Sequence, residues 1–88
     1  MVLPIEHKSE LFDLNQETRS EIMEVTNICV EILKKVLKPG GFNVGINIGE
    51  SAGQTCMYPH VHLIFRRDGD MENPRGGVRG VIPSKQNY

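Results

Sequence analysis

The sequence has no tryptophan, only two cysteines (Cys29 and Cys56), and no apolar run near the roughly 18 residues that a membrane-spanning helix needs. Two cysteines outside a CxxC spacing do not make a disulfide scaffold, so we expect a reducing, cytoplasmic environment. Charge is balanced as well, with Lys plus Arg at 10, Asp plus Glu at 11 and a net charge of −1. This balance argues against nucleic-acid and membrane partners held by positive charge.

The longest periodic segment predicts a helix of about six turns that begins after Asn15 and ends before Pro39. Asn15 is a favourable N-cap residue, and lysines gather at the other end, where the helix dipole is negative. Apolar residues recur at steps of three and four and predict one buried stripe: Ile22, Val25, Ile28, Cys29, Ile32, Leu33 and Val36.

Two alternating segments follow and predict strands at 42–48 and 58–67, paired as an antiparallel hairpin across the loop 49–55. A short strand at 1–3 is also expected. The glycine- and proline-rich segment after residue 68 excludes long regular elements, although 74–80 is a candidate for wrapping a ligand or a partner. The predicted fold is therefore α+β, with one long helix packed on a small antiparallel sheet.

The second predicted strand carries the most informative chemistry. Because side chains two apart on a strand share a face, Tyr58, His60 and His62 lie on one face, and Val61 and Phe65 pack with Leu63 on the other. One imidazole of such a pair can attack a phosphate while the other donates a hydrogen bond to it. Two ordinary surface histidines are an equally simple interpretation. A zinc site is a third, with Cys56 and His7 as further candidate ligands.

The loop 49–55 lies directly before that strand. Its glycines free backbone N–H groups to face an anion, and Gln54 and Thr55 add neutral donors. Without a neighbouring site, an ordinary hairpin loop would be the simpler interpretation. Proximity to the two histidines favours contact with a phosphate.

Gly45–Thr55, which reads GINIGESAGQT, followed by a His-x-His strand, resembles the histidine-triad (HIT) family of nucleotide hydrolases and transferases. The opening VLPIEH and the tail GDMENPRGGVRGVIP are also similar to members of that family. The resemblance implies that His60 is the nucleophile and that His62 contacts phosphate. It further implies phosphate or leaving-group contacts from Gln54 and Thr55, and lining positions at Asn47 and Gly53.

The resemblance also exposes two departures. Tyr58 stands where the family has its first histidine, which predicts impaired activity. The family's further N-terminal strands are missing before Met1, so we expect residues 1–88 to form a single, partial HIT-like domain with an exposed sheet edge. Family members form dimers with a shared sheet, which implies a homodimer or a swapped assembly.

The function predicted from this resemblance is hydrolysis or nucleotidyl transfer at a phosphoanhydride or phosphoramidate bond, through a nucleotidyl-histidine intermediate. The implied ligand is a purine nucleotide or a dinucleoside polyphosphate, with no cofactor and no metal. The competing hypothesis is a non-catalytic dimer that binds nucleotide or serves as an interaction module.

Overall fold

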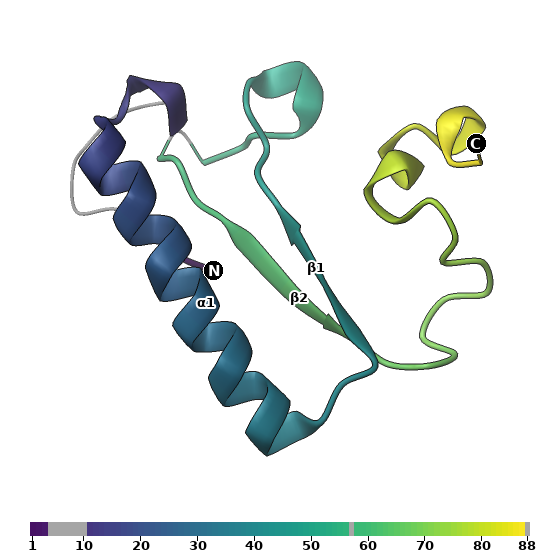
Figure 1. The fold of residues 1–88 in the computed structure, drawn as a ribbon. Helices are drawn as coiled ribbons and strands as arrows, with labels where there is room; N and C mark the ends of the chain where they lie inside the picture. Colours follow the sequence, from purple (N-terminus) through teal and green to yellow (C-terminus); the bar gives the residue numbers. More distant parts are fainter. Residues whose placement is uncertain (4–10, 57, 88) are drawn as a thin grey trace.

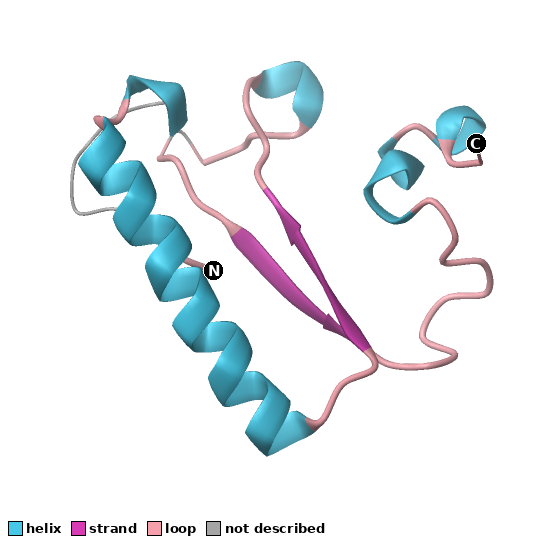
Figure 2. Ribbon diagram, viewed as in Figure 1, coloured by secondary structure: helices cyan, strands magenta, loops and turns pink. Residues whose placement is uncertain are grey.

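The fold is seen in a computed structural model that describes residues 1–3, 11–56 and 58–87 (Figure 1). One long helix lies beside a two-stranded antiparallel sheet, and a C-terminal segment of two short 3-10 turns lies on the other side of the strands (Figure 2). This arrangement confirms the predicted α+β fold. The elements in chain order are η1 (Leu11–Asp13), α1 (Gln16–Leu37), β1 (Gly41–Gly45), η2 (Glu50–Ala52), β2 (His62–Arg66), η3 (Gly77–Val81) and η4 (Pro83–Lys85).

Helix α1 begins and ends where the sequence predicts. The side-chain oxygen of Asn15 accepts a hydrogen bond of 2.8 Å from the backbone N–H of Thr18, which satisfies one of the free donors of the first turn. At the other end Lys38 adopts a left-handed conformation with φ 46°, and Pro39 follows. Since proline has no N–H and a fixed φ, the helix does not continue.

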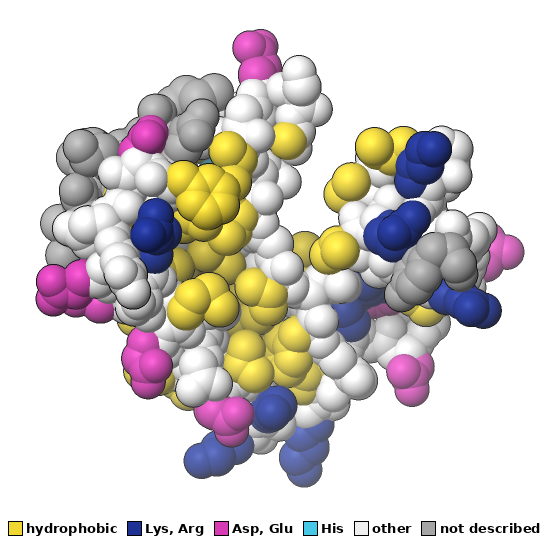
Figure 3. All heavy atoms as spheres, turned by 45° about the horizontal axis from the view of Figure 1, so that its top comes forward, with side chains coloured by type: hydrophobic (Ala, Val, Ile, Leu, Met, Phe, Trp, Pro, Cys, Tyr) yellow, Lys and Arg dark blue, Asp and Glu magenta, His cyan; other side chains and the backbone are white. Residues whose placement is uncertain are grey.

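The apolar stripe of α1 is only partly buried, and here the prediction is wrong. Ile22 is buried, and Cys29 and Leu33 are half-buried. The stripe is wider than two strands can cover, so its outer side chains stay in solvent: Val25, Ile28, Ile32 and Val36. Figure 3 shows hydrophobic side chains gathered on the surface of the helix-and-sheet body.

Both strands are shorter than predicted. Strand β1 ends at Gly45, and β2 begins only at His62. Pro59 has no N–H to give to a ladder, which delays the start of β2. Val61 instead pairs with Val2 through two backbone hydrogen bonds of 2.9 Å, so the expected strand at 1–3 is a single antiparallel bridge.

The core lies between α1 and one face of the sheet. Its buried apolar residues are Val2, Leu14, Ile22 and Val61. The register places Val44 opposite Leu63 and Phe42 opposite Phe65, so these four side chains share the helix-facing side. Phe65 nevertheless remains 40% exposed, contrary to its predicted packing. Within the described residues, no helix has the length and apolar character needed to cross a bilayer.

Candidate functional site

His60 and His62 lie next to each other at the start of β2. Their ring centroids are 4.7 Å apart, and the ring planes are inclined by 74°. Pro59 and Val61 alternate with them and are fully buried, which anchors the backbone on both sides of His60. The sequence-based expectation of two neighbouring imidazoles therefore agrees with the geometry. Their catalytic roles remain predictions.

The ring of His60 has a defined orientation. Its Nδ1 lies 2.8 Å from the backbone carbonyl oxygen of Tyr58. A carbonyl oxygen can only accept, so Nδ1 must carry the proton in this hydrogen bond. In the neutral ring, Nε2 then holds the lone pair, as a nucleophile or a base requires. Tyr58 supplies this orientation through its backbone and not through its side chain.

Gln54 holds the preceding loop together. Its side chain is buried, with Oε1 accepting 2.8 Å from the N–H of Gly49 and Nε2 donating 3.3 Å to the carbonyl of Cys56. The loop is thus closed by a side-chain amide that spans both of its ends. This explains the burial of a polar residue, and the predicted phosphate contact of Gln54 remains a prediction.

Several backbone N–H groups of the loop point into the loop itself. Those of Ala52 and Gln54 donate to the carbonyl of Gly49, and that of Gly53 donates 2.9 Å to Glu50. Gly53 has φ 94°, a left-handed conformation that favours glycine. Thr55 is exposed and makes no hydrogen bond to the described part of the chain. The phosphate roles of Gly53 and Thr55 therefore stay predictions.

A groove extends from His62 along the face of the sheet that points away from α1. It holds about 490 Å³, and its sheet wall includes Asn47 and Ile64 while its opposite wall includes Val78 and Val81. Figure 3 shows the hollow between the helix-and-sheet body and the C-terminal segment that carries η3 and η4. Asn47, which was predicted to line the nucleotide site, is among the residues that line this groove, and its role in binding stays a prediction. Val78 falls in the segment 74–80 that was a candidate for wrapping a ligand or a partner, whereas Val81 was not predicted, and nothing local in the sequence indicates that this segment returns to the sheet.

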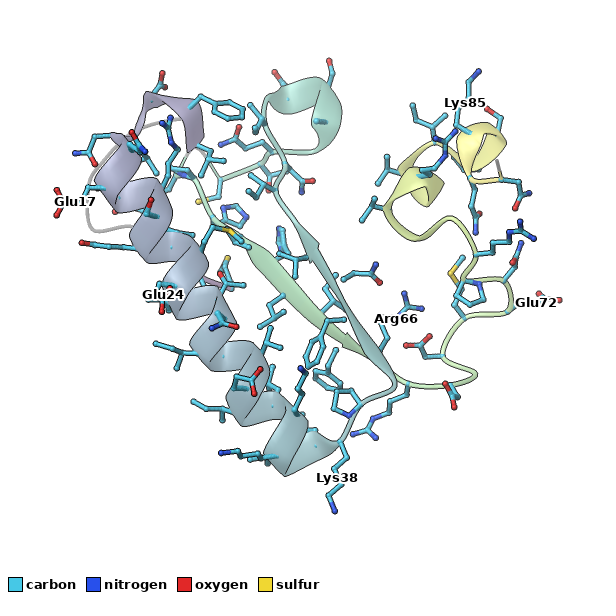
Figure 4. All side chains as sticks on the ribbon, viewed as in Figure 1. Glu17, Glu24, Lys38, Arg66, Glu72 and Lys85 are labelled. Carbon is cyan, nitrogen blue, oxygen red and sulfur yellow. The ribbon has the colours of Figure 1, made fainter. Side chains whose placement is uncertain are left out.

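Arg66 lies at the end of β2 opposite to His62 and links the C-terminal segment to the sheet (Figure 4). Its guanidinium donates two hydrogen bonds of 2.8 and 2.6 Å to the Asp70 carboxylate and a third of 2.7 Å to the side-chain oxygen of Asn43. The hydrogen bonds from Arg66, then that from the Arg67 backbone, lower the pKa of Asp70 to about 2. The guanidinium of Arg66 is therefore occupied by protein partners.

The zinc interpretation gains no support from the described side chains. In residues 1–3, 11–56 and 58–87, no group of three His, Cys, Asp or Glu residues is placed to hold a metal ion. Cys56 is exposed and Cys29 is half-buried, and both are free thiols. His7, the remaining candidate ligand, lies outside the described residues.

The chain belongs to the HIT family, since the HIT domain model matches residues 1–69. It is 42% identical over 71 residues to an AP-4-A phosphorylase of Mycobacterium tuberculosis, covering 80% of this chain and 36% of that protein. It is 30% identical over 70 residues to a bis(5'-nucleosyl)-tetraphosphatase (asymmetrical) of Schizosaccharomyces pombe, covering 80% and 38%. The chain thus spans little more than a third of the length of these relatives.

Solved structures agree with this assignment. A HIT family protein from Bacillus anthracis superposes with a TM-score of 0.72 at 39% identity, covering 76% of this chain and 48% of that one. A zinc-bound histidine triad family protein from Mycobacterium smegmatis gives 0.72 at 30% identity, covering 81% and 52%. The α+β arrangement of α1 and the two strands is therefore that of the HIT fold.

Proposed function

We propose that the chain hydrolyses or transfers nucleotides through a nucleotidyl-histidine intermediate on His60. The observation that carries the proposal is the hydrogen bond from Nδ1 of His60 to the Tyr58 carbonyl, which leaves Nε2 with its lone pair. Nε2 attacks the α-phosphorus and forms a P–N bond, while the bond from phosphorus to the leaving group breaks. Water then attacks the same phosphorus, releases the nucleoside monophosphate and restores the free imidazole.

His62 is the second participant in this proposal. Its ring lies 4.7 Å from that of His60, close enough for both to meet one phosphate group. As a hydrogen-bond donor it stabilises the charge on a non-bridging oxygen as the phosphorus is attacked. Gln54 and Thr55 are the proposed neutral contacts to the phosphate or the leaving group, and Asn47 and Gly53 are the proposed lining positions.

Impairment by Tyr58 is the finer part of the proposal. A histidine at this position would orient His60 through the same backbone carbonyl, so the side chain is not needed for that bond. Any impairment must then arise from the phenol side chain of Tyr58, which replaces an imidazole beside the proposed phosphate site. The Tyr58→His variant tests this: a protein that binds nucleotide yet gains no turnover would contradict the impairment.

The proposed substrates are purine nucleotides and dinucleoside polyphosphates. Support comes from the names of two relatives, an AP-4-A phosphorylase and a bis(5'-nucleosyl)-tetraphosphatase. Both names describe enzymes that act on bonds between the phosphates of nucleotides. A site with two neighbouring histidines can perform this chemistry. We also propose that residues 1–88 act as a single, partial HIT-like domain.

Turnover of a nucleoside phosphoramidate by the wild type and by His60→Ala tests the proposal. We expect His60→Ala to reduce turnover by at least a thousandfold, because no other group replaces the nucleophile, and His62→Ala to reduce it by about a hundredfold or more. A radiolabelled nucleotidyl-protein should be trapped with the wild type and absent from His60→Ala. Equal rates near background in a folded His60→Ala protein and the wild type would remove the enzyme proposal.

The second candidate function is a non-catalytic dimer that binds nucleotide or a partner. It is favoured by the exposed apolar side chains along α1, such as Ile28 and Ile32, which are 52% and 55% exposed. Contiguous apolar surface of this kind marks interaction sites. If this face pairs two copies, Ile28→Glu should convert a dimer into a monomer in light-scattering chromatography. A wild type that is monomeric at all concentrations would contradict the predicted dimer.

A further inference from the structure

The groove beside His62 has no Lys or Arg side chain to meet an anion. Among the described residues, its lining consists of asparagines, glycines, apolar side chains and His62, with no Lys, Arg, Asp or Glu. Arg66, the basic residue of β2, already donates to Asp70 and Asn43. A chain of phosphates that reaches His60 therefore finds no side-chain cation of this kind in the lining to balance its charge.

The C-terminal segment beside the groove carries positive charge. Residues 73–87 contain no acidic side chain and three basic ones, which are all exposed: Arg75, Arg79 and Lys85. Arg79 stands between Val78 and Gly80, which both line the groove. Figure 3 shows Lys and Arg side chains on this segment beside the hollow. Glu72, which precedes these residues, lies at the outer edge of the segment, away from the strands (Figure 4).

Polar contacts hold the three basic residues on one piece of folded chain. The side-chain nitrogen of Gln86 donates 2.7 Å to the carbonyl of Asn73 and 3.0 Å to that of Arg75. Arg79 donates 3.0 Å from Nε to the carbonyl of Lys85, which links η3 to the end of η4. These bonds close a ring of chain. Because Arg75 and Lys85 take part in them through their backbone carbonyls, a substitution of either side chain leaves the ring closed.

We propose that the basic surface formed by Arg75, Arg79 and Lys85 binds the phosphates of the leaving group and thereby favours substrates whose leaving group is a polyanion. This rests on the proposed function, because the leaving group departs from the phosphorus that His60 attacks. Nε2 forms its bond to the α-phosphorus of a dinucleoside polyphosphate, and the electron pair of the broken P–O bond stays on the bridging oxygen. The departing nucleoside polyphosphate carries this new charge besides those of its other phosphates. Lys and Arg bind such oxygens through charge-assisted hydrogen bonds.

A phosphoramidate cannot use this contact. When its P–N bond breaks, the nitrogen takes up a proton from water and leaves as neutral ammonia. Binding energy that is available to one substrate and not to another changes the ratio of their kcat/KM values. The basic surface therefore acts on the choice between these two substrates. Since its side chains are exposed, salt should weaken its effect.

Lys85→Gln and Arg75→Gln are the test variants, and Lys35→Gln is the matched control. Each removes one exposed positive charge, but Lys35 lies on α1 and not beside the groove. The measured quantity is kcat/KM for diadenosine tetraphosphate divided by kcat/KM for adenosine phosphoramidate. We expect this ratio to fall about threefold in each test variant and about tenfold in the double variant, with Lys35→Gln unchanged. Salt at about 0.5 M should lower the wild-type ratio in the same direction.

An unchanged ratio in both test variants would overturn the proposal, and so would an equal fall in Lys35→Gln. Either result would leave phosphoramidate turnover, and with it the role of His60, intact.

Binding of tripolyphosphate requires no turnover and separates this proposal from the catalytic one. It is followed by the backbone amide shifts of isotope-labelled His60→Ala protein. We expect shifts within residues 75–85 and binding about threefold weaker when Lys85→Gln is added. Tripolyphosphate that shifts no amide in 75–85 would overturn the proposal. Binding there by a wild type that shows no turnover would overturn only the catalytic proposal.

Discussion

The N-cap of α1 gives the sharpest test of how the local sequence stabilises this fold. Asn15→Ala removes the oxygen that accepts 2.8 Å from the N–H of Thr18. Losing such a cap costs about 1 kcal/mol in the free energy of unfolding, within a range of roughly 0.5–2 kcal/mol. For a domain of this size that corresponds to a fall of about 4–8 °C in Tm. Urea denaturation followed by circular dichroism measures the change.

The same substitution elsewhere in α1 provides the control. Asn27 is exposed in the middle of the helix, where alanine is a better helix former by up to about 0.7 kcal/mol. Asn27→Ala should therefore stabilise the protein while Asn15→Ala destabilises it. Asn15→Asp should retain stability, because its carboxylate accepts the same bond and favours the helix N-terminus. Asn15→Ala and Asn27→Ala shifting stability in the same direction would refute the capping role.

Three further outcomes are expected. Val61→Ala should lower the free energy of unfolding by about 2–3 kcal/mol in urea denaturation, because it removes two buried carbons and leaves a cavity; an unchanged midpoint would contradict the core. Gly76→Ala, whose Cβ would lie 2.0 Å from the Gln86 carbonyl oxygen, should speed tryptic cleavage of the C-terminal segment, whereas Gly80→Ala should not; equal cleavage would contradict the closed ring. The pKa of Asp70 is lowered from 3.8 to about 2, so its carboxylate should keep the ion pair with Arg66 above about pH 4 and lose it as the pH falls through 2. The NMR signal of the Arg66 side chain should change over that pH range, and a signal that stays unchanged at low pH would contradict this.

The helix was predictable because its signals are local. Asn15 and the Lys38–Pro39 pair act within one turn of the chain, and their geometry follows from residue type alone. The pairing of β1 with β2 was predictable for a similar reason, since alternation and a short loop make a hairpin. The predicted start of β2 at residue 58 was wrong because Pro59 has no N–H to donate to the ladder, so regular pairing begins only at His62.

Long-range packing accounts for what the sequence could not predict. Whether Val25 or Val36 is buried depends on how many strands pack against the helix. The spacing of apolar residues along the helix does not reveal how many strands there are. The valines of η3 lie across the groove from Ile64 only because the chain returns to the sheet after Arg66. The glycine-rich pattern made 74–80 a candidate for wrapping a ligand or a partner, but it does not specify a return to the sheet.

The core and the candidate site are coupled through one alternation. Along residues 59–62, Pro59 and Val61 are buried while His60 and His62 are only partly buried. A register slip of one residue would send the imidazoles into the core and expose Val61. The two backbone bonds between Val2 and Val61 oppose such a slip at the residue between the histidines. The bridge at Val2 therefore contributes to the geometry of the candidate site as well as to stability, because it helps determine the side of the sheet on which both rings lie.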